Sequence, residues 1–578
     1  AADIQLAAEN YIGFAGVLDP QTALSAGYDF VADAAADIDD TFDNYSPVFG
    51  FVVEDALIDQ PDVDPLNAWD RDDFLGATGL NPTNPGDPLV PVNLVSFNMH
   101  FDFDEALPSS GDASGDYTSN LISTADLADA DLAGGIWFTV GCHSGTNVPD
   151  ISVIANAPSD DWAQAFNRLG ANYLAQNAFG LGDTVAIALT ERLMANFARN
   201  LNGHLTIGQA HAFAKQQYFA DLGLYGEYDY KALQAATLFG LPMYQYGNGA
   251  MVTEPLVDTP LVATDPISGL ASASWSETTD ITETPTDKGA LFNVEGEVQF
   301  VHIRPLQPIV RQDVTSPDGG TASGAFLTGL VTEDILVQDI AFARPVIDLG
   351  KNEPEIETDE VVFPTAFTNI ANYKAPPVGG GPFTPRDQLN VIVGQFTSPL
   401  DGQTNGTERL FRSFGTQIFY RPAATEPPVL PTTPATGGDF VRPEFDNVQA
   451  SIVGSPGSEQ AAFSIDASDE GTVLRVAVLY LQSVSETVTP SGIQKKGHWT
   501  LVDLVKGGGN TWTGGGPVED TATTNGQIDY IVQAVDDNGN VANSTFKGLF
   551  YVAEALPAAP APDPDADPGD IGVIITVD

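Results

Sequence analysis

Two residues that could perform catalysis each follow a predicted strand of this chain: His100 and the only cysteine, Cys142. His100 comes after the apolar run 89–97, and Cys142 comes after the run 135–140. In an open parallel sheet, the carboxyl ends of strands are where ligands and catalytic groups collect. The two residues are 142 − 100 = 42 positions apart, which leaves room for a crossover connection between neighbouring strands. A thiol beside an imidazole can form the thiolate that acyl transfer requires.

Each of these residues also has a structural explanation. A single cysteine is commonly a small buried apolar residue, and an isolated histidine is commonly a hydrogen-bonded one. Cys142, however, lies in Gly141-Cys-His-Ser-Gly145, a strand-to-loop turn that would expose its thiol. His143 is a rival base, but neighbours on an extended chain point to opposite sides, so it would face away from the thiol. His204 and His211 lack a carboxylate in register, so no zinc site is predicted there.

The elements expected around these residues alternate strands with helices, a pattern typical of a mostly parallel α/β sheet. Strands are expected at 89–97, 135–140 and 170–175, after a strand-to-helix passage at 23–38, and helices at 161–169, 183–200, 206–219 and 230–238. Thr206, with Gln209 three residues later, forms a capping-box pattern at the start of one of these helices.

The composition excludes several classes of partner. The chain has 22 basic and 78 acidic residues and a formal net charge of −56, which repels nucleic acids and acidic lipid surfaces. A hydrophobic content of 43% is nevertheless enough to build cores. Because no run of 18 apolar residues occurs, no membrane span is predicted. A single cysteine also excludes an intrachain disulfide and a cysteine-based zinc cluster.

The acidity is concentrated in the first 140 residues, which contain 26 acids and one base, a net charge of 1 − 26 = −25. The simplest interpretation is a solvated surface, but the carboxylates could also bind calcium or attract a cationic substrate. The densest candidates are Asp70-Arg-Asp-Asp73 and the tail from Asp563 to Asp570, although the prolines of the tail favour a plain linker. A structural calcium ion is therefore one hypothesis, no cofactor is expected for the chemistry, and the metal ligands are unknown.

After residue 250 the helical periods disappear and short alternating runs rich in Thr, Val, Pro and Gly predict all-β modules. The expected units are a β-sandwich at 251–421, a Pro/Thr-rich linker at 422–438, an immunoglobulin-like module at 439–553, and a Pro/Asp-rich linker with the start of a further element at 554–578. The strand 528–535 and the turn 536–540 resemble those of bacterial immunoglobulin-like modules in large surface proteins.

The order and spacing of several motifs within residues 24–246 resemble the catalytic domain of gingipain-type cysteine peptidases, relatives of caspases. The motifs that carry the resemblance lie at 25–30, 96–102, 141–149, 161–166, 180–183, 206–210 and 238–243. The resemblance implies a multidomain protein: a caspase-like α/β domain over 1–250, with a mostly parallel sheet and helices on both faces, followed by two all-β sandwich domains. It also implies further strands before the matched region, which this sequence does not contain.

The resemblance assigns a role to each site residue. Cys142 would be the nucleophile, and His100 the base and acid that protonates the leaving amine. The backbone N–H groups of Cys142 and Phe101 would form the oxyanion hole. The family usually has glycine after the histidine, so Phe101 would place a bulky side chain beside the cleft. The loop 176–183, with Gly180 and Asp183, would line the substrate pocket, where Asp183 would select a basic side chain or instead cap the next helix.

The expected function is therefore that of a secreted or cell-surface cysteine endopeptidase that acts on proteins or peptides. The alternative is a structural surface, adhesin or filament protein built on a peptidase-like domain with weak or lost activity. Either function implies an extracellular or cell-surface location. The first residues, 1–6, lack the features of a signal peptide, so an export signal is expected to have been removed unless the sequence is a fragment.

Overall fold

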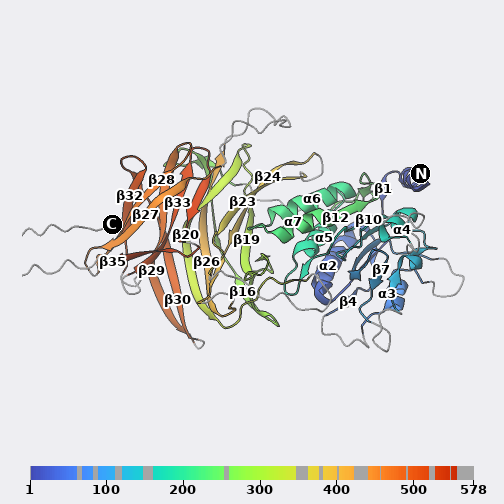
Figure 1. Ribbon diagram of the computed structural model, residues 1–578. Helices are drawn as coiled ribbons and strands as arrows, with labels where there is room; N and C mark the ends of the chain where they lie inside the picture. Colours follow the sequence, from blue (N-terminus) through green and yellow to red (C-terminus); the bar gives the residue numbers. More distant parts are fainter. Residues whose placement is uncertain are drawn as a thin grey trace, which may run out of the picture.

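The computed structural model describes an α/β part and a larger β part, which lie side by side (Figure 1). The residues described are 2–555 apart from 61–67, 82–88, 111–119, 148–159, 253–259, 347–361, 377–381, 400–402, 422–440, 456, 490–491, 520–526 and 547. The predicted linker 422–438, the acidic tail 563–570 and the predicted element 571–577 therefore lie outside the described residues. Within the described ranges, no helix is both long and apolar enough to cross a membrane.

A mostly parallel sheet forms the centre of the α/β part. Its order is β12-β10-β9-β5-β2-β3, with β4 also paired to β2, and only β12 is antiparallel to its neighbour. The strands are β2 (Thr22–Tyr28), β3 (Val52–Val53), β4 (Leu57–Asp59), β5 (Leu94–Asn98), β9 (Ile136–Phe138), β10 (Asn172–Gln176) and β12 (Ala236–Phe239). All residues of β5, β9 and β10 are buried, as expected for strands covered on both faces.

Helices cover both faces of this sheet. Successive strand residues point to opposite sides, so Leu94 packs in one hydrophobic cluster and Val95 in another. The first cluster includes residues of α2 (Ala32–Phe49), α5 (Leu189–Asn200) and α6 (Ile207–Ala220). The second includes residues of α3 (Arg71–Ala77) and α4 (Trp162–Arg168). The other elements of this part are α1 (Ala2–Gly13), η1 (Asp29–Val31), η3 (Thr124–Leu127), α7 (Glu227–Ala235), β1 (Val17–Leu18), β6 (His100–Phe101), β7 (Glu105–Leu107), β8 (Ile122–Ser123), β11 (Gly182–Asp183) and β13 (Gln245–Tyr246).

The predicted helices differ from the observed ones where the chain forms long-range pairs. The capping box at the start of α6 is confirmed, since Thr206 and Gln209 exchange hydrogen bonds. The helix expected from residue 183 begins only at Leu189, because β11 pairs with β21 (Pro345–Val346) of the β part. The helix expected to reach residue 238 ends at Ala235, because the chain continues as β12 along β10.

The β part consists almost entirely of antiparallel strands. Its remaining strands are β14 (Ala263–Thr264), β15 (Ala271–Thr278), β16 (Ile281–Thr286), β17 (Gly289–Val294), β18 (Val298–Gln299), β19 (Gln307–Asp313), β20 (Thr321–Val337), β22 (Val362–Phe363), β23 (Thr368–Ala375), β24 (Thr384–Ile392), β25 (Gly394–Thr397), β26 (Gly406–Arg421), β27 (Glu444–Val453), β28 (Gln460–Ser468), β29 (Val473–Thr489), β30 (Gly492–Asp503), β31 (Val505–Lys506), β32 (Thr511–Pro517), β33 (Gln527–Asp536), β34 (Val541–Ser544) and β35 (Tyr551–Ala555).

The two expected β-sandwiches share one sheet. β20 pairs with β26 on one side and with β30 on the other, and β30 pairs with β29 of the C-terminal module. β20 and β29 each have 17 residues and β30 has 12, well beyond the usual five or six of a strand. The expectation of two sandwiches joined through their linker is corrected in this respect, because these long strands also join the modules by a hydrogen-bonded ladder.

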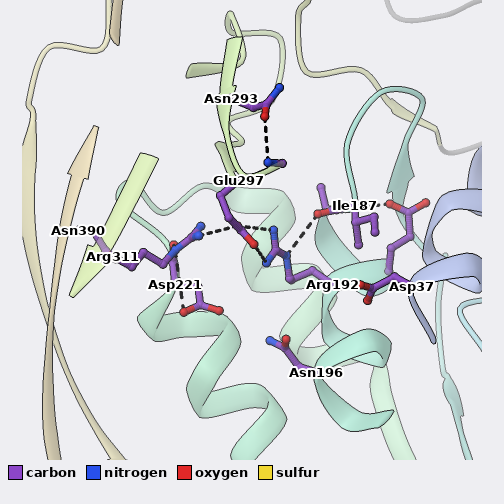
Figure 2. Close-up of polar contacts among 12 residues, drawn as sticks. Asp37, Ile187, Arg192, Asn196, Asp221, Asn293, Glu297, Arg311 and Asn390 are labelled. Carbon is purple, nitrogen blue, oxygen red and sulfur yellow. Dashed lines mark hydrogen bonds and ion pairs between the residues drawn. The ribbon is translucent and has the colours of Figure 1, made fainter. Parts of the chain in front are cut away.

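A charged network joins the α/β part to the β part (Figure 2). Arg192 of α5 donates two hydrogen bonds to the Glu297 carboxylate, at 2.9 and 2.7 Å, and Arg311 of β19 donates a third at 2.5 Å. Burial alone would raise the pKa of Glu297, but the two guanidinium groups lower that pKa to about 2. Arg311 also donates to the backbone carbonyl of Asp221 at the end of α6, at 2.8 Å. The network therefore connects α5 and the end of α6, on one face of the parallel sheet, to the β part.

Candidate functional site

The pairing between β5 and β9 brings His100 and Cys142 to the same edge of the sheet. Leu94 pairs with Ile136, an offset of 136 − 94 = 42 positions that equals the offset between His100 and Cys142. Two residues beyond the ladder, the Val140 N–H donates to the side-chain oxygen of Asn98 at 3.0 Å, so the two chains are still adjacent there. The parallel pairing therefore carries both residues to the same edge of the sheet.

Phe101 packs against the residue that precedes the cysteine. Its side chain is 9% exposed, and its ring centroid lies 5.5 Å from that of Trp162. A Cβ added to Gly141 would lie 2.0 Å from a ring carbon of Phe101, so only glycine fits at position 141. The expected bulky side chain is therefore next to the cysteine turn, but it is buried against Gly141 and the aromatic core.

The imidazole of His100 contacts a carboxylate that the sequence reasoning missed. His100 Nε2 lies 3.4 Å from Asp29 Oδ2, and the side chains are 11% and 50% exposed, respectively. The rings of Tyr28 and Phe30 each lie 5.5 Å from the imidazole, so three consecutive residues, beginning with the last residue of β2, contact it. Asp29 has a φ of 55°, a left-handed conformation that is uncommon outside glycine and that often marks functional sites. One sequence signal could have identified Asp29: it directly follows an apolar strand, so it lies at the same edge of the sheet as His100.

A loop that follows β10 lies against Cys142. The Cys142 Sγ donates to the carbonyl of Gly180 at 3.4 Å, and the His143 N–H donates to the carbonyl of Ala178 at 2.8 Å. A Cβ on Gly180 would lie 1.8 Å from the Val140 carbonyl oxygen, which explains the glycine there. His143 has a φ of 56°, so the extended backbone assumed for it is wrong, and its ring packs against Phe179 at 4.7 Å. The predicted loop therefore does flank the cysteine.

The backbone N–H of Phe101 is directed away from β7. The Asp102 N–H donates to the Glu105 carbonyl at 2.8 Å, and Phe101 is the next residue along this antiparallel pair. Successive residues in such a pair alternate in the direction of their hydrogen-bonding groups. The oxyanion role of the Phe101 and Cys142 N–H groups remains a prediction that this geometry allows.

Asp183 is buried, whereas we expected it to line the substrate pocket or to cap the next helix. Its side chain is completely buried, and its carboxylate accepts hydrogen bonds from the backbone N–H groups of Val185, at 2.9 Å, and Arg344. It does not cap α5, which begins six residues later, at Leu189. Burial raises the pKa of Asp183 to about 6. The residue therefore anchors the loop to the β part.

Asp183 belongs to a carboxyl cluster, with the buried Glu191 and the half-buried Asp33, that the sequence reasoning also missed. Glu191 is fully buried and accepts from the backbone N–H groups of Asp183, at 3.2 Å, and Ala188, at 3.1 Å. Burial raises the pKa of Glu191 well above its ordinary value, and the Asp33 and Asp183 charges add to this rise. Burial likewise raises the pKa of Asp33 to about 7. These three groups therefore hold protons at higher pH than ordinary carboxyls do.

The described calcium candidate, 70–73, forms a helix cap. Asp70 accepts from the Asp73 N–H at 3.0 Å, and Asp73 accepts from the Asp70 N–H at 2.9 Å, which is a capping box at the start of α3. In the part of the chain that the structure describes, no three His, Cys, Asp or Glu side chains are placed so that they could hold a metal ion together. The carboxylates of 70–73 thus have a structural explanation.

Comparisons with known proteins give weak likenesses. No family model matches the chain, and no curated protein matches it. Among solved structures, the complex of Porphyromonas gingivalis RgpB pro- and mature domains has 14% identity and a TM-score of 0.19, over 32% of this chain and 92% of the other. A structure described as a protease has 6% identity and a TM-score of 0.26, over 71% of this chain and 72% of the other. Structural neighbours thus include proteases, but such TM-scores carry no argument about activity, which must come from the site itself.

Proposed function

We propose that the protein is a cysteine endopeptidase of the gingipain type. The observation that carries the proposal is the parallel pairing of β5 with β9, because His100 and Cys142 follow these two neighbouring strands at the same edge of the sheet. The contact between His100 and Asp29 supports it further, because a carboxylate can orient a catalytic imidazole. The combination supplies a nucleophile, a base and an orienting group at one sheet edge.

In the proposed mechanism, the imidazole of His100 takes the thiol proton as the Cys142 sulfur attacks a peptide carbonyl. The carbonyl π electrons move to oxygen, and the N–H groups of Cys142 and Phe101 stabilise that oxyanion. When the tetrahedral intermediate collapses, the C–N bond breaks and the imidazolium protonates the leaving amine. Water, deprotonated by His100, then hydrolyses the thioester. Because Asp29 contacts Nε2 of His100, the other ring nitrogen, Nδ1, is the one that exchanges the proton with the Cys142 sulfur in this mechanism.

We further propose an extracellular or cell-surface location and protein or peptide substrates. The net charge of −56 fits this proposal, because it keeps such a chain soluble and away from nucleic acids. The chemistry requires no cofactor, and structural calcium would act on stability alone. Unfolding with and without a chelator tests the calcium hypothesis.

A structural surface role is the second candidate. It is favoured by the continuous ladder from β26 through β20 to β30 and β29, which joins two modules into one sheet. Such a ladder makes an extended, stiff support whether or not the neighbouring α/β part is active.

Probe labelling tests the two candidates against each other. The folded chain is treated at neutral pH with an acyloxymethyl ketone peptide, and the modified residue is mapped by mass spectrometry. The endopeptidase proposal requires rapid labelling of Cys142 that is lost in the His100→Ala variant. His498→Ala, in an exposed position on β30, is the matched histidine control. An unlabelled Cys142 in folded protein would support the structural role instead.

A further inference from the structure

We infer that the surface beside Cys142 selects an apolar, preferably aromatic, substrate side chain through Phe179 and Phe30. This inference rests on the proposed endopeptidase function and specifies its substrate class. It departs from the expectation that Asp183 selects a basic side chain.

The loop 177–182 forms the wall nearest to the nucleophile. Ala178 and Gly180 bond to His143 and Cys142 through their carbonyl groups, so Phe179 lies between two direct contacts of the cysteine turn. A substrate whose carbonyl carbon is attacked by the sulfur therefore comes within reach of this wall.

The wall offers an exposed aromatic surface. Phe179 is 50% exposed, although it packs edge-on against the His143 ring. Phe30 is half-buried at the end of the loop: its ring is 5.5 Å from that of His100, and a Cβ on Gly182 would lie 2.7 Å from a Phe30 ring carbon. Burying an apolar substrate side chain against these rings removes hydrocarbon surface from water, and aromatic rings pair favourably with one another.

A basic side chain would find no free carboxylate along this wall. Loop residues 177–182 are Asn, Ala, Phe, Gly, Leu and Gly, so none carries a charge. Asp183 is completely buried, bonds to the Arg344 N–H, and lies close enough to the Arg344 guanidinium for that charge to lower its pKa against the effect of burial. Asp29 is half exposed, but its carboxylate contacts His100. Against the described loop 177–182, a cationic side chain would lose hydration without gaining a charged partner from that loop.

The test uses the full chain and two acyloxymethyl ketone peptides that differ only in the residue next to the reactive group, phenylalanine or arginine. Iodoacetamide, which has no such side chain, serves as the reference reagent. We expect Cys142 to react with the phenylalanine probe about tenfold faster than with the arginine probe. Phe179→Ala should lower the rate with the phenylalanine probe about tenfold and leave the iodoacetamide rate unchanged.

Two controls separate selectivity from folding. Phe219→Ala removes a phenylalanine of similar exposure, 44%, on α6 and should leave all rates unchanged. Phe179→Leu keeps an apolar side chain and should restore part of the preference. Faster labelling by the arginine probe, or an unchanged ratio in Phe179→Ala, would overturn the inference while leaving the endopeptidase proposal intact. Failure of both ketones to label Cys142 would overturn the endopeptidase proposal, and this inference with it.

Discussion

His100 Nε2 lies 3.4 Å from Asp29 Oδ2, across a separation of 71 residues in the sequence. Asp29 follows β2 and His100 follows β5, and these strands are direct neighbours in the parallel sheet. The same sheet then places β9, and with it Cys142, next to β5. Three consecutive strands of one sheet thus end in a carboxylate, an imidazole and a thiol, in that order.

Asp29→Asn should slow the reaction and leave the fold intact. Asparagine tolerates the left-handed backbone at this position, but it removes the negative charge that orients the imidazole. We expect kcat/KM to fall about 10- to 100-fold, measured with a fluorogenic peptide. Asp72→Asn, whose side chain is 75% exposed, is the matched control. An equal fall in kcat/KM in both variants would contradict the role of Asp29 in orienting the imidazole.

Phe101→Ala should destabilise the α/β part. The ring is buried against Gly141, Phe97 and Trp162, so its removal leaves a cavity and costs about 3–5 kcal/mol. Urea unfolding measures this cost. Phe546→Ala, at a 57% exposed position, should change the stability by less than about 0.5 kcal/mol. An unchanged free energy of unfolding in Phe101→Ala would mean that the ring does not pack as described.

Stability should fall as pH rises from about 4 to about 7. The pKa values of Asp33 and Asp183 are raised to about 7 and about 6 from an ordinary 3.8, so the folded state holds protons that the unfolded state has lost. The stabilisation is complete below the unfolded value and is lost as pH passes through the folded values. The melting temperature, measured as a function of pH, reports this loss of stability. The dependence on pH should be weaker in Asp33→Asn. Asp287→Asn, whose side chain is 75% exposed, should preserve it.

Glu297→Gln should weaken the contact between the two parts. The change removes the charge shared by Arg192 and Arg311, and because Glu297 is 36% exposed, water offsets part of the loss. We expect a cost of about 1–3 kcal/mol in unfolding free energy, while Glu295→Gln, two residues away and exposed, should be close to neutral. Equal stabilities for the two variants would show that the network does not join the parts.

The local features of the site followed from the sequence, and its long-range pairs did not. Apolar runs before His100 and Cys142, and the Thr206 capping pattern, are signals carried by neighbouring residues. The roles of Asp183 and Asp29, by contrast, depend on partners 161 and 71 residues away. The β20–β30 ladder was missed for the same reason, since an alternating pattern identifies a strand but not its neighbour.

The most direct test of the central claim is the pH dependence of Cys142 alkylation by iodoacetamide, in the folded wild type and in His100→Ala. A cysteine paired with an imidazole reacts as a thiolate well below the ordinary thiol pKa of about 8.5. The account predicts that the wild type reacts at pH 6.5 at least about tenfold faster than His100→Ala, and that the two rates converge above about pH 9. Identical pH profiles in the two folded proteins would contradict it.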